Sequence, residues 1–247
     1  MPTRSPYKVL LTGAGGLLGK KLVERALESQ IMCPFSRNEL DVANAAQVRA
    51  RFEEVNPDVC IHAAAMTTPM RAHQSLPTLS IETNIVGTAS IAQQCWRYHT
   101  RLVYISTDYV YPGDVRRMWG EEDGVRPVNK YAWSKMGGEC VAHMLDDALI
   151  VRCSHSDEPF KHPKAVTDAY KTPMSVDKVA TYILQLIERE ATGVYNIGGE
   201  SQSVYDFAKQ SKPDVGKITR QDIDEPVALD TSMDTTKLLE FLDDPTI

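Results

Sequence analysis

The chain has 247 residues, of which 43% are hydrophobic, and a formal net charge of −6. This length and apolar content allow a sizeable core and exclude a globally disordered chain. The acidic balance argues against a nucleic-acid-binding surface, because phosphate binding needs clustered Lys and Arg. No signal-peptide-like apolar run and no stretch of about 18 apolar residues is present, so we expect a cytoplasmic protein without membrane contact.

Short apolar runs alternate with helical patterns up to residue 154. The runs predict buried strands at residues 8–12, 31–35, 58–65, 101–107 and 148–154. Helical patterns follow the first strand, as far as Leu27, and recur at residues 44–55, at 78–98 and around Tyr131. Strands that are apolar throughout and alternate with helices indicate a parallel sheet covered on both faces. The sequence therefore predicts an α/β fold with a doubly wound parallel sheet.

The alternation loosens after residue 154. Residues 154–173 show no clear periodicity. Helices are then predicted at residues 175–190, 204–210 and 234–242, and a short strand at residues 193–199. Five scattered cysteines without a C-x-x-C pair predict reduced thiols, and neither a disulfide framework nor a zinc knuckle.

Three glycines lie between the first predicted strand and the first predicted helix. Gly13, Gly16 and Gly19 have the spacing G-x-x-G-x-x-G. Glycine lets the backbone approach a pyrophosphate, and the N–H groups and positive dipole end of the following helix attract phosphate. A glycine-rich turn without a ligand is the alternative. The position at the first strand-to-helix crossover favours dinucleotide binding.

The end of the second predicted strand indicates which dinucleotide is bound. NAD-binding folds usually carry an acidic residue there, about 20 residues after the glycines, which holds the ribose 2′-hydroxyl. Ser36 and Arg37 occupy this point. A hydroxyl and a guanidinium suit a 2′-phosphate, so we expect NADP(H), with NAD(H) as the alternative. An ordinary solvated loop charge is the other interpretation of Arg37.

Two Tyr–Lys pairs share a four-residue spacing, which places both side chains on one face of a helix. Tyr131 and Lys135 follow a predicted strand at the carboxyl edge of the sheet, where ligands of such sheets bind. The Lys charge is expected to lower the pKa of Tyr131 and to prepare its hydroxyl for proton transfer to a ketone. Tyr205 and Lys209 lie late in the chain, and we interpret them as a packed ring and a solvated amine.

With this turn and this pair, the chain resembles the extended short-chain dehydrogenase/reductase superfamily, and within it the dTDP-4-dehydrorhamnose reductase family. The matching stretches follow the family order over nearly the whole chain. They are LTGAGGLLGKKL, ELDV, NPDVCIHAAAMT, YISTDYVYPG, RPVNKYAWSKMGGE, TPMSVDKVA, GVYNIGGES and SMDTTKL. The combination is specific, although each stretch alone is not.

The resemblance implies a set of site residues. Thr107 stands at the position of the residue that supplies the family's catalytic hydroxyl, and Tyr131 and Lys135 stand at the positions of its catalytic Tyr–Lys pair. Cofactor contacts are expected at Gly13, Gly16, Leu17, Leu18, Gly19, Ser36, Arg37, Asp41, Val42, Ala63, Ala64, Ala65, Tyr131 and Lys135. Substrate contacts are expected at Thr67, Thr107, Tyr109 and Tyr131.

The same resemblance implies the organisation of the chain. It implies an NAD(P)-binding Rossmann domain over residues 1–154 and a reduced substrate-binding region over residues 155–247, partly interleaved with the first. A homodimer is also implied. His155 stands where the family often has a Trp near the sugar, and the segment 155–172 is shorter than in most members. Part of the substrate cover is therefore expected to be missing.

The resemblance implies reduction of a 4-keto-6-deoxy sugar nucleotide by a Thr/Tyr/Lys triad, in the synthesis of dTDP-rhamnose and surface polysaccharide, and Ser36 and Arg37 favour NADP(H) as the cofactor. Water elimination is disfavoured, because Tyr109 stands where related dehydratases carry a Glu. A sugar-nucleotide epimerase is one alternative. A non-catalytic regulatory subunit is another, since the family includes a regulatory subunit of methionine adenosyltransferase. No His or carboxylate cluster has metal-binding spacing, so no metal is expected.

Overall fold

In the computed structural model, residues 6–67, 70–156 and 159–243 are described. Six strands of this part form a central sheet in the order β10-β5-β4-β3-β1-β2, and every neighbouring pair is parallel. The strands are β1 (Tyr7–Thr12), β2 (Gln30–Phe35), β3 (Val59–His62), β4 (Arg101–Thr107), β5 (Leu149–Cys153) and β10 (Gly193–Ile197). The parallel sheet predicted from the sequence is confirmed.

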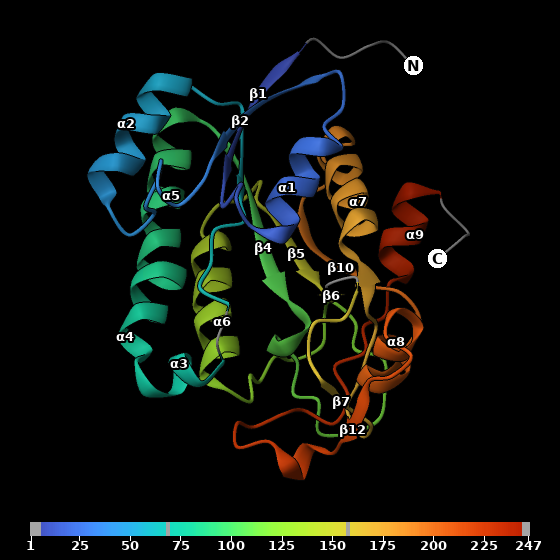
Figure 1. The fold of residues 1–247 in the computed structure, drawn as a ribbon. Helices are drawn as coiled ribbons and strands as arrows, with labels where there is room; N and C mark the ends of the chain where they lie inside the picture. Colours follow the sequence, from blue (N-terminus) through green and yellow to red (C-terminus); the bar gives the residue numbers. More distant parts are fainter. Residues whose placement is uncertain (1–5, 68–69, 157–158, 244–247) are drawn as a thin grey trace.

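Helices cover both faces of the sheet (Figure 1). They are α1 (Leu17–Glu24) and α7 (Val176–Glu188) on one face, and α2 (Ala45–Val55), α5 (Gly87–Tyr98) and α6 (Lys130–Ala142) on the other. Successive side chains of a strand point to opposite faces. Val9 and Leu11 of β1 therefore join the apolar cluster under α1 and α7, while Leu10 joins the cluster under α2 and α5. The doubly wound arrangement follows from these two clusters.

The strand order reverses at β1, because β2 pairs with one edge of β1 and β3 pairs with the other. Ligands of open parallel sheets bind at this point, in the crevice beyond the carboxyl ends of the strands. Gly13 follows the end of β1, and Ala63 follows the end of β3. The fold therefore brings the glycine turn and the alanine run to the same crevice.

The remaining elements are short. The paired strands are β6 (His155–Ser156) with β9 (Met174–Ser175), β7 (Lys164–Val166) with β12 (Gly216–Ile218), and β8 (Tyr170–Lys171) with β11 (Gln202–Ser203). The helices are α3 (Met70–Ser75), α4 (Pro77–Ser80), α8 (Val204–Ser211) and α9 (Thr236–Leu242), with 3-10 turns at Asp108–Val110 and Arg220–Asp222. α7 and β10 return to the main sheet; the division at residue 154 into two partly interleaved regions stays a prediction.

Three helical segments differ from the sequence prediction. α1 ends at Glu24, and Leu27 lies beyond it. The helix expected over residues 78–98 consists of α4, a π-helical turn over Ile81–Val86 and α5; apolar periodicity does not reveal such a widened turn. α3 has only six residues, too few for a periodic pattern. Among the described residues, none of the helices has the length and apolar character needed to cross a membrane.

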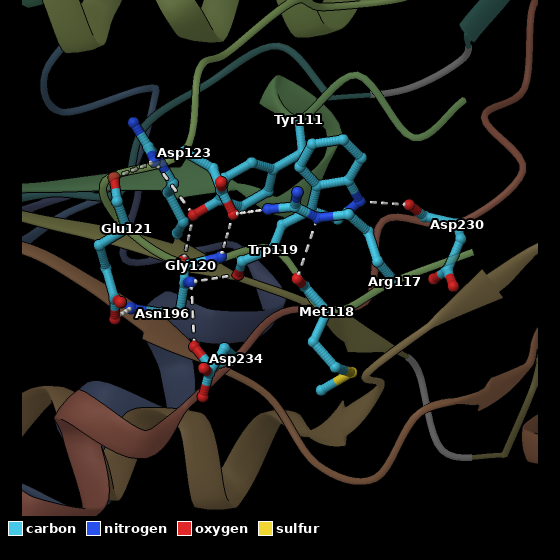
Figure 2. Close-up of polar contacts among 11 residues, drawn as sticks. Tyr111, Arg117, Met118, Trp119, Gly120, Glu121, Asp123, Asn196, Asp230 and Asp234 are labelled. Atoms are coloured by element: carbon cyan, nitrogen blue, oxygen red, sulfur yellow. Dashed lines mark hydrogen bonds and ion pairs between the residues drawn. The ribbon is translucent and has the colours of Figure 1, made fainter. Parts of the chain in front are cut away.

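The loop between β4 and α6 is tied to distant parts of the chain (Figure 2). Nδ2 of the buried Asn196 in β10 donates to the carbonyl oxygens of Trp119 and Asp234. The Tyr111 hydroxyl donates to Oδ1 of Asn196 at 2.8 Å. The indole N–H of Trp119 donates to the Asp230 carbonyl oxygen. These bonds fix the loop that leads into α6 against β10 and the segment before α9.

Candidate active site

The glycine turn brings β1, α1 and the segment after β3 into close contact. Gly13 has a φ of +74°, and a Cβ there would lie 2.6 Å from the backbone nitrogen of Ala64. A Cβ at Gly19 would collide with the Gly13 carbonyl oxygen. Only glycine allows this packing without strain. Gly16 precedes α1, and no side chain caps the first turn of that helix, so its N–H groups are available to an anion.

A cavity of about 390 Å³ lies beside this turn, beyond the ends of β1, β2 and β3. Its lining includes the predicted cofactor residues Gly13, Gly16, Ser36, Arg37, Asp41, Val42, Ala63, Ala64 and Ala65. Apart from Asp41, the sequence prediction placed no acidic residue at this end, where Ser36 and Arg37 stand at the usual acidic position. The fold nevertheless brings in Glu39, whose carboxylate accepts the Ser36 backbone N–H at 2.8 Å and the Ser36 hydroxyl at 2.6 Å. This end of the site thus presents both a guanidinium and a carboxylate.

A second cavity, of about 170 Å³, continues toward β4 and α6. It shares Gly13, Gly16, Ala63 and Ala65 with the first cavity. Its lining adds the predicted residues Leu17, Leu18, Gly19, Thr67, Tyr131 and Lys135, together with Ser106 and His155. Every predicted cofactor contact therefore lines one of two adjoining cavities, which form one site running from Arg37 to Tyr131.

α6 carries Tyr131 and Lys135 to the second cavity. The side chain of Asn129 caps this helix by accepting the Ala132 N–H at 2.9 Å. Lys135 is buried, and its Nζ lies 4.3 Å from the centroid of the Tyr104 ring. Burial lowers the pKa of Lys135 to about 8. The amine is therefore close to losing its proton at the alkaline end of the physiological range.

The pKa of Tyr131 differs from the sequence prediction. Burial raises it, and the neighbouring Cys153 and Asp108 raise it further. The positive charge that opposes this rise is Lys171, not Lys135. The predicted lowering by Lys135 is wrong for this structure, because the prediction left out the cost of placing a phenolate in a poorly solvated position.

Thr107 ends β4 and is buried. Its hydroxyl donates to Oδ1 of Asp108 at 3.0 Å and accepts the Tyr109 N–H at 3.3 Å. In the described part of the chain, the second cavity is lined by the neighbouring Ser106, not by Thr107. Thr107 is thus the residue after the lining residue Ser106 of the second cavity, and its hydroxyl caps the 3-10 turn that follows.

A third cavity, of about 530 Å³, adjoins the second among the short strands. His155 lines both cavities, and the predicted substrate contact Tyr109 lines the third. Lys171 also lines the third cavity. Sequence reasoning missed Lys171, because a single Lys in a stretch without periodicity carries no spacing signal. Among the described residues, no group of three His, Cys, Asp or Glu side chains is arranged to hold a metal ion.

The π-helical turn holds the loop that borders the first two cavities. Oδ1 of the buried Asn84 accepts the Met66 N–H at 2.7 Å, and its Nδ2 donates to the Met66 carbonyl oxygen at 3.0 Å. Nδ2 also donates to the Ser134 hydroxyl of α6 at 2.8 Å. Asn84 therefore fixes this loop relative to the helix that carries Tyr131. No motif in the sequence indicated this role, although irregular helical turns often occur at functional sites.

The second Tyr–Lys pair lies elsewhere. Tyr205 packs against the apolar cluster of Ala165, Ala208 and Val215. Lys209 is exposed, with its Nζ 5.9 Å from the Tyr205 ring centroid. Neither residue lines the three cavities described above. The interpretation of this pair as a packed ring and a solvated amine is confirmed.

The sequence of the chain is similar to one protein family and to several known proteins. The family model described as RmlD substrate binding domain matches residues 7–156. A dTDP-4-keto-6-deoxy-D-glucose reductase of Streptomyces niveus is 28% identical over 222 residues, covering 82% of this chain and 76% of that protein. Methionine adenosyltransferase 2 subunit beta of Xenopus tropicalis is 28% identical over 228 residues, covering 79% of this chain and 68% of that protein.

A solved structure resembles the whole described fold. It is the crystal structure of a dTDP-4-dehydrorhamnose reductase from Bacillus anthracis in complex with NADP. The two structures superpose with a TM-score of 0.86 at 26% sequence identity, covering 96% of this chain and 92% of that one. The likeness therefore includes the short elements after residue 154 as well as the main sheet.

Proposed function

The chain belongs to the RmlD substrate binding domain family, the family of the dTDP-4-dehydrorhamnose reductases. On this premise we propose that it reduces a 4-keto-6-deoxy sugar nucleotide with NADPH. The product would serve dTDP-rhamnose and surface polysaccharide synthesis. The observation that carries the proposal is one continuous site, with Arg37 at one end and Tyr131 and Lys135 at the other.

The residues of this site fit a dinucleotide. Gly13, Gly15 and Gly16 present only backbone to the first cavity, and the uncapped first turn of α1 offers N–H groups to a pyrophosphate. Arg37 supports a 2′-phosphate at the far end, whereas Glu39 would favour a ribose hydroxyl. We favour NADP(H) because a phosphate can displace the Ser36 hydroxyl from Glu39 and pair with the guanidinium. The bound dihydronicotinamide supplies the hydride.

Tyr131 is the proposed proton donor. As the substrate carbon accepts the hydride, the Tyr131 O–H bond breaks and the proton goes to the substrate oxygen. The electron pair stays on the phenolate oxygen. Lys171 is the positive charge that lowers the pKa of Tyr131 in this structure, and the proposal adds the Lys135 ammonium, on the same helix face, as a second stabilising charge when substrate and cofactor are bound. Thr107 completes the proposed triad at the end of β4. Tyr109 and Thr67, on the third and second cavities, are the proposed substrate contacts.

A regulatory subunit is the second candidate function. The Xenopus tropicalis methionine adenosyltransferase subunit is 28% identical to this chain, the same identity as the Streptomyces niveus reductase. A regulatory subunit would bind the dinucleotide without turning over a sugar. The intact Tyr131 and Lys135 on a cavity favour catalysis. An epimerase would use the same Tyr but would not release its cofactor. The expected homodimer and cytoplasmic location stay predictions.

The experiment follows the loss of nicotinamide absorbance with NADPH or NADH across a panel of 4-keto sugar nucleotides. Tyr131→Phe removes one hydroxyl, so the fold and NADPH binding are expected to persist. Reduction is expected to fall at least about a hundredfold, the usual worth of a positioned proton donor. Tyr205→Phe is the matched control and should keep the rate within about twofold, as substitutions away from the site usually do.

The possible outcomes separate the candidate functions. A fully active Tyr131→Phe variant with an unchanged melting temperature would remove Tyr131 from the mechanism. Binding of NADPH by the unaltered protein, without turnover of any ketosugar, would support the regulatory subunit instead. A nucleotide that co-purifies and does not exchange would support the epimerase.

A further inference from the structure

A buried ion pair lies beside the third cavity. Nζ of Lys171 is 2.9 Å from Oδ2 of Asp108, and the two side chains are 18% and 2% exposed. Lys171 reaches this point from β8, whose antiparallel pairing with β11 fixes its backbone. Asp108 comes directly after β4, in the 3-10 turn. The pair therefore joins the end of the main sheet to the second region of the chain.

The Asp108 carboxylate is held by donors from three segments. Thr107 Oγ1 donates to Oδ1 at 3.0 Å, and Thr231 Oγ1 donates to Oδ2 at 2.7 Å. Both of these donors are neutral hydroxyls. Among the described residues, Lys171 is thus the donor that balances the carboxylate charge. A buried carboxylate that loses its counter-ion is strongly unfavourable.

Tyr109 connects this pair to Tyr131. The Lys171 ammonium lies 3.9 Å from the Tyr109 ring centroid, within the range of a cation–π contact. The Tyr109 ring meets the Tyr131 ring edge-on, with the centroids 6.2 Å apart. The pKa of Tyr131 is raised by the Asp108 charge and lowered by the Lys171 charge. Other titratable groups around Tyr131 are Cys153 from β5, Tyr104 from β4, His73 from α3, Lys135 on α6 and His155 on the same cavity.

We propose that Lys171 is a positioning residue for the reduction, which neutralises Asp108 so that Tyr131 can carry a negative charge after proton transfer. The inference rests on the proposed function, in which the Tyr131 proton goes to the ketone oxygen and the phenolate oxygen keeps the electron pair. Without Lys171, that phenolate would form beside an unbalanced carboxylate. Proton donation would become harder, while the cofactor site around Gly13 and Arg37 would stay intact.

The first test measures kcat and KM for the ketosugar. Lys171→Met is expected to lower kcat by about tenfold or more, the worth of one pKa unit, with little change in KM. Combining Lys171→Met with Asp108→Asn removes both charges and is expected to restore most of kcat. Lys217→Met is the matched control, because Lys217 is exposed and its Nζ lies 5.0 Å from the Tyr205 ring outside the site.

The second test uses the reverse reaction, oxidation of the sugar alcohol with NADP⁺. This direction needs tyrosinate, so its rate rises with pH throughout the range below the raised pKa of Tyr131. Lys171→Met is expected to move that rise to higher pH by about one unit, and the double substitution with Asp108→Asn to move it back. A purely structural role for Lys171 would not move this profile.

Melting temperatures give a readout that needs no substrate. Lys171→Met leaves a buried carboxylate without its counter-ion, so the melting temperature is expected to fall by several degrees, and the double variant to recover it. An unchanged melting temperature, or no recovery in the double variant, would overturn the counter-ion role even in a protein that reduces no ketosugar. An increase in KM alone, with kcat and the pH profile unchanged, would show instead that Lys171 binds the substrate. Absence of turnover in the unaltered protein would refute the proposed function and leave this stability test standing.

Discussion

Burial, more than spacing in the sequence, decides the protonation of Tyr131 and Lys135. The four-residue spacing places both side chains on one helix face and on the same cavity. Poor solvation then favours the neutral form of each side chain. It raises the pKa of Tyr131 and lowers the pKa of Lys135. The charge that each residue carries during turnover therefore depends on its neighbours in space.

The pH dependence of the reaction follows from Lys135. Its pKa of about 8 lies below the ordinary Lys value, so the ammonium is present below that pH and lost above it. In the proposed mechanism this ammonium adds to the stabilisation of the phenolate, so kcat/KM for NADPH at saturating ketosugar is expected to fall as the pH rises through about 8. A profile of kcat/KM from neutral to alkaline pH measures this.

Lys135→Arg provides the control for that profile. A guanidinium keeps its charge throughout this pH range, so the fall near pH 8 should disappear even where the maximal rate is lower. If the variant shows the same fall at the same pH, another group is responsible for it.

Single residues were predictable from the sequence where a local motif carries the chemistry. The glycines, the alanine run and the Tyr131–Lys135 pair all line the two adjoining cavities. Lys171 and Glu39 were not predictable as site residues, because their roles arise from contacts with Asp108 and Ser36 that only the fold creates.

At the scale of elements, the sequence predicts regular segments well and irregular ones poorly. Continuous apolar runs mark strands that are buried on both faces, as the fully buried β3 and β5 show. The π-helical turn around Asn84 and the two- and three-residue strands after residue 154 leave no periodic trace. They are held by tertiary hydrogen bonds, which a single sequence does not display.

The junction between β1 and α1 is testable at Gly16. Gly13 is unsuitable, because its positive φ and its contact with Ala64 mean that a side chain there would disturb the fold itself. A Cβ at Gly16 would lie 3.2 Å from the Gly13 carbonyl oxygen, which a small shift can relieve. Gly16→Ala is therefore expected to fold and to bind NADPH about tenfold more weakly, equal to about 1.4 kcal/mol. Calorimetric titration measures the affinity.

The control for Gly16 is an open glycine. A Cβ at Gly124 would meet nothing within 4 Å, so Gly124→Ala should change neither affinity nor melting temperature. Equal NADPH affinity in both variants would show that the phosphates bind away from the first turn of α1.

At the scale of the whole molecule, buried polar contacts that the alternating pattern does not reveal connect β5 and α6 with β10 and the segment before α9. Arg152 of β5 donates to Glu139 of α6 at 2.9 Å, and this buried pair also reaches the Tyr111 hydroxyl. Asn196 then links Tyr111 to the loop after β4 and to the segment before α9 (Figure 2). The sequence predicts the sheet, but not these links, which come from tertiary contacts.

Asn196→Ala tests how much these links stabilise the molecule. Asn196 is fully buried, and the substitution leaves the Tyr111 hydroxyl and the carbonyl oxygens of Trp119 and Asp234 without this partner. The Trp119 carbonyl keeps the Asp234 N–H and the Tyr111 hydroxyl keeps Arg152, so the free energy of unfolding is expected to fall by about 1–3 kcal/mol. Urea unfolding followed by circular dichroism measures it, with the exposed Gln93→Ala on α5 expected to stay within about 0.5 kcal/mol of the unaltered protein. If Asn196→Ala unfolds at the same urea concentration as Gln93→Ala, the side-chain hydrogen bonds of Asn196 do not contribute to the stability of the molecule.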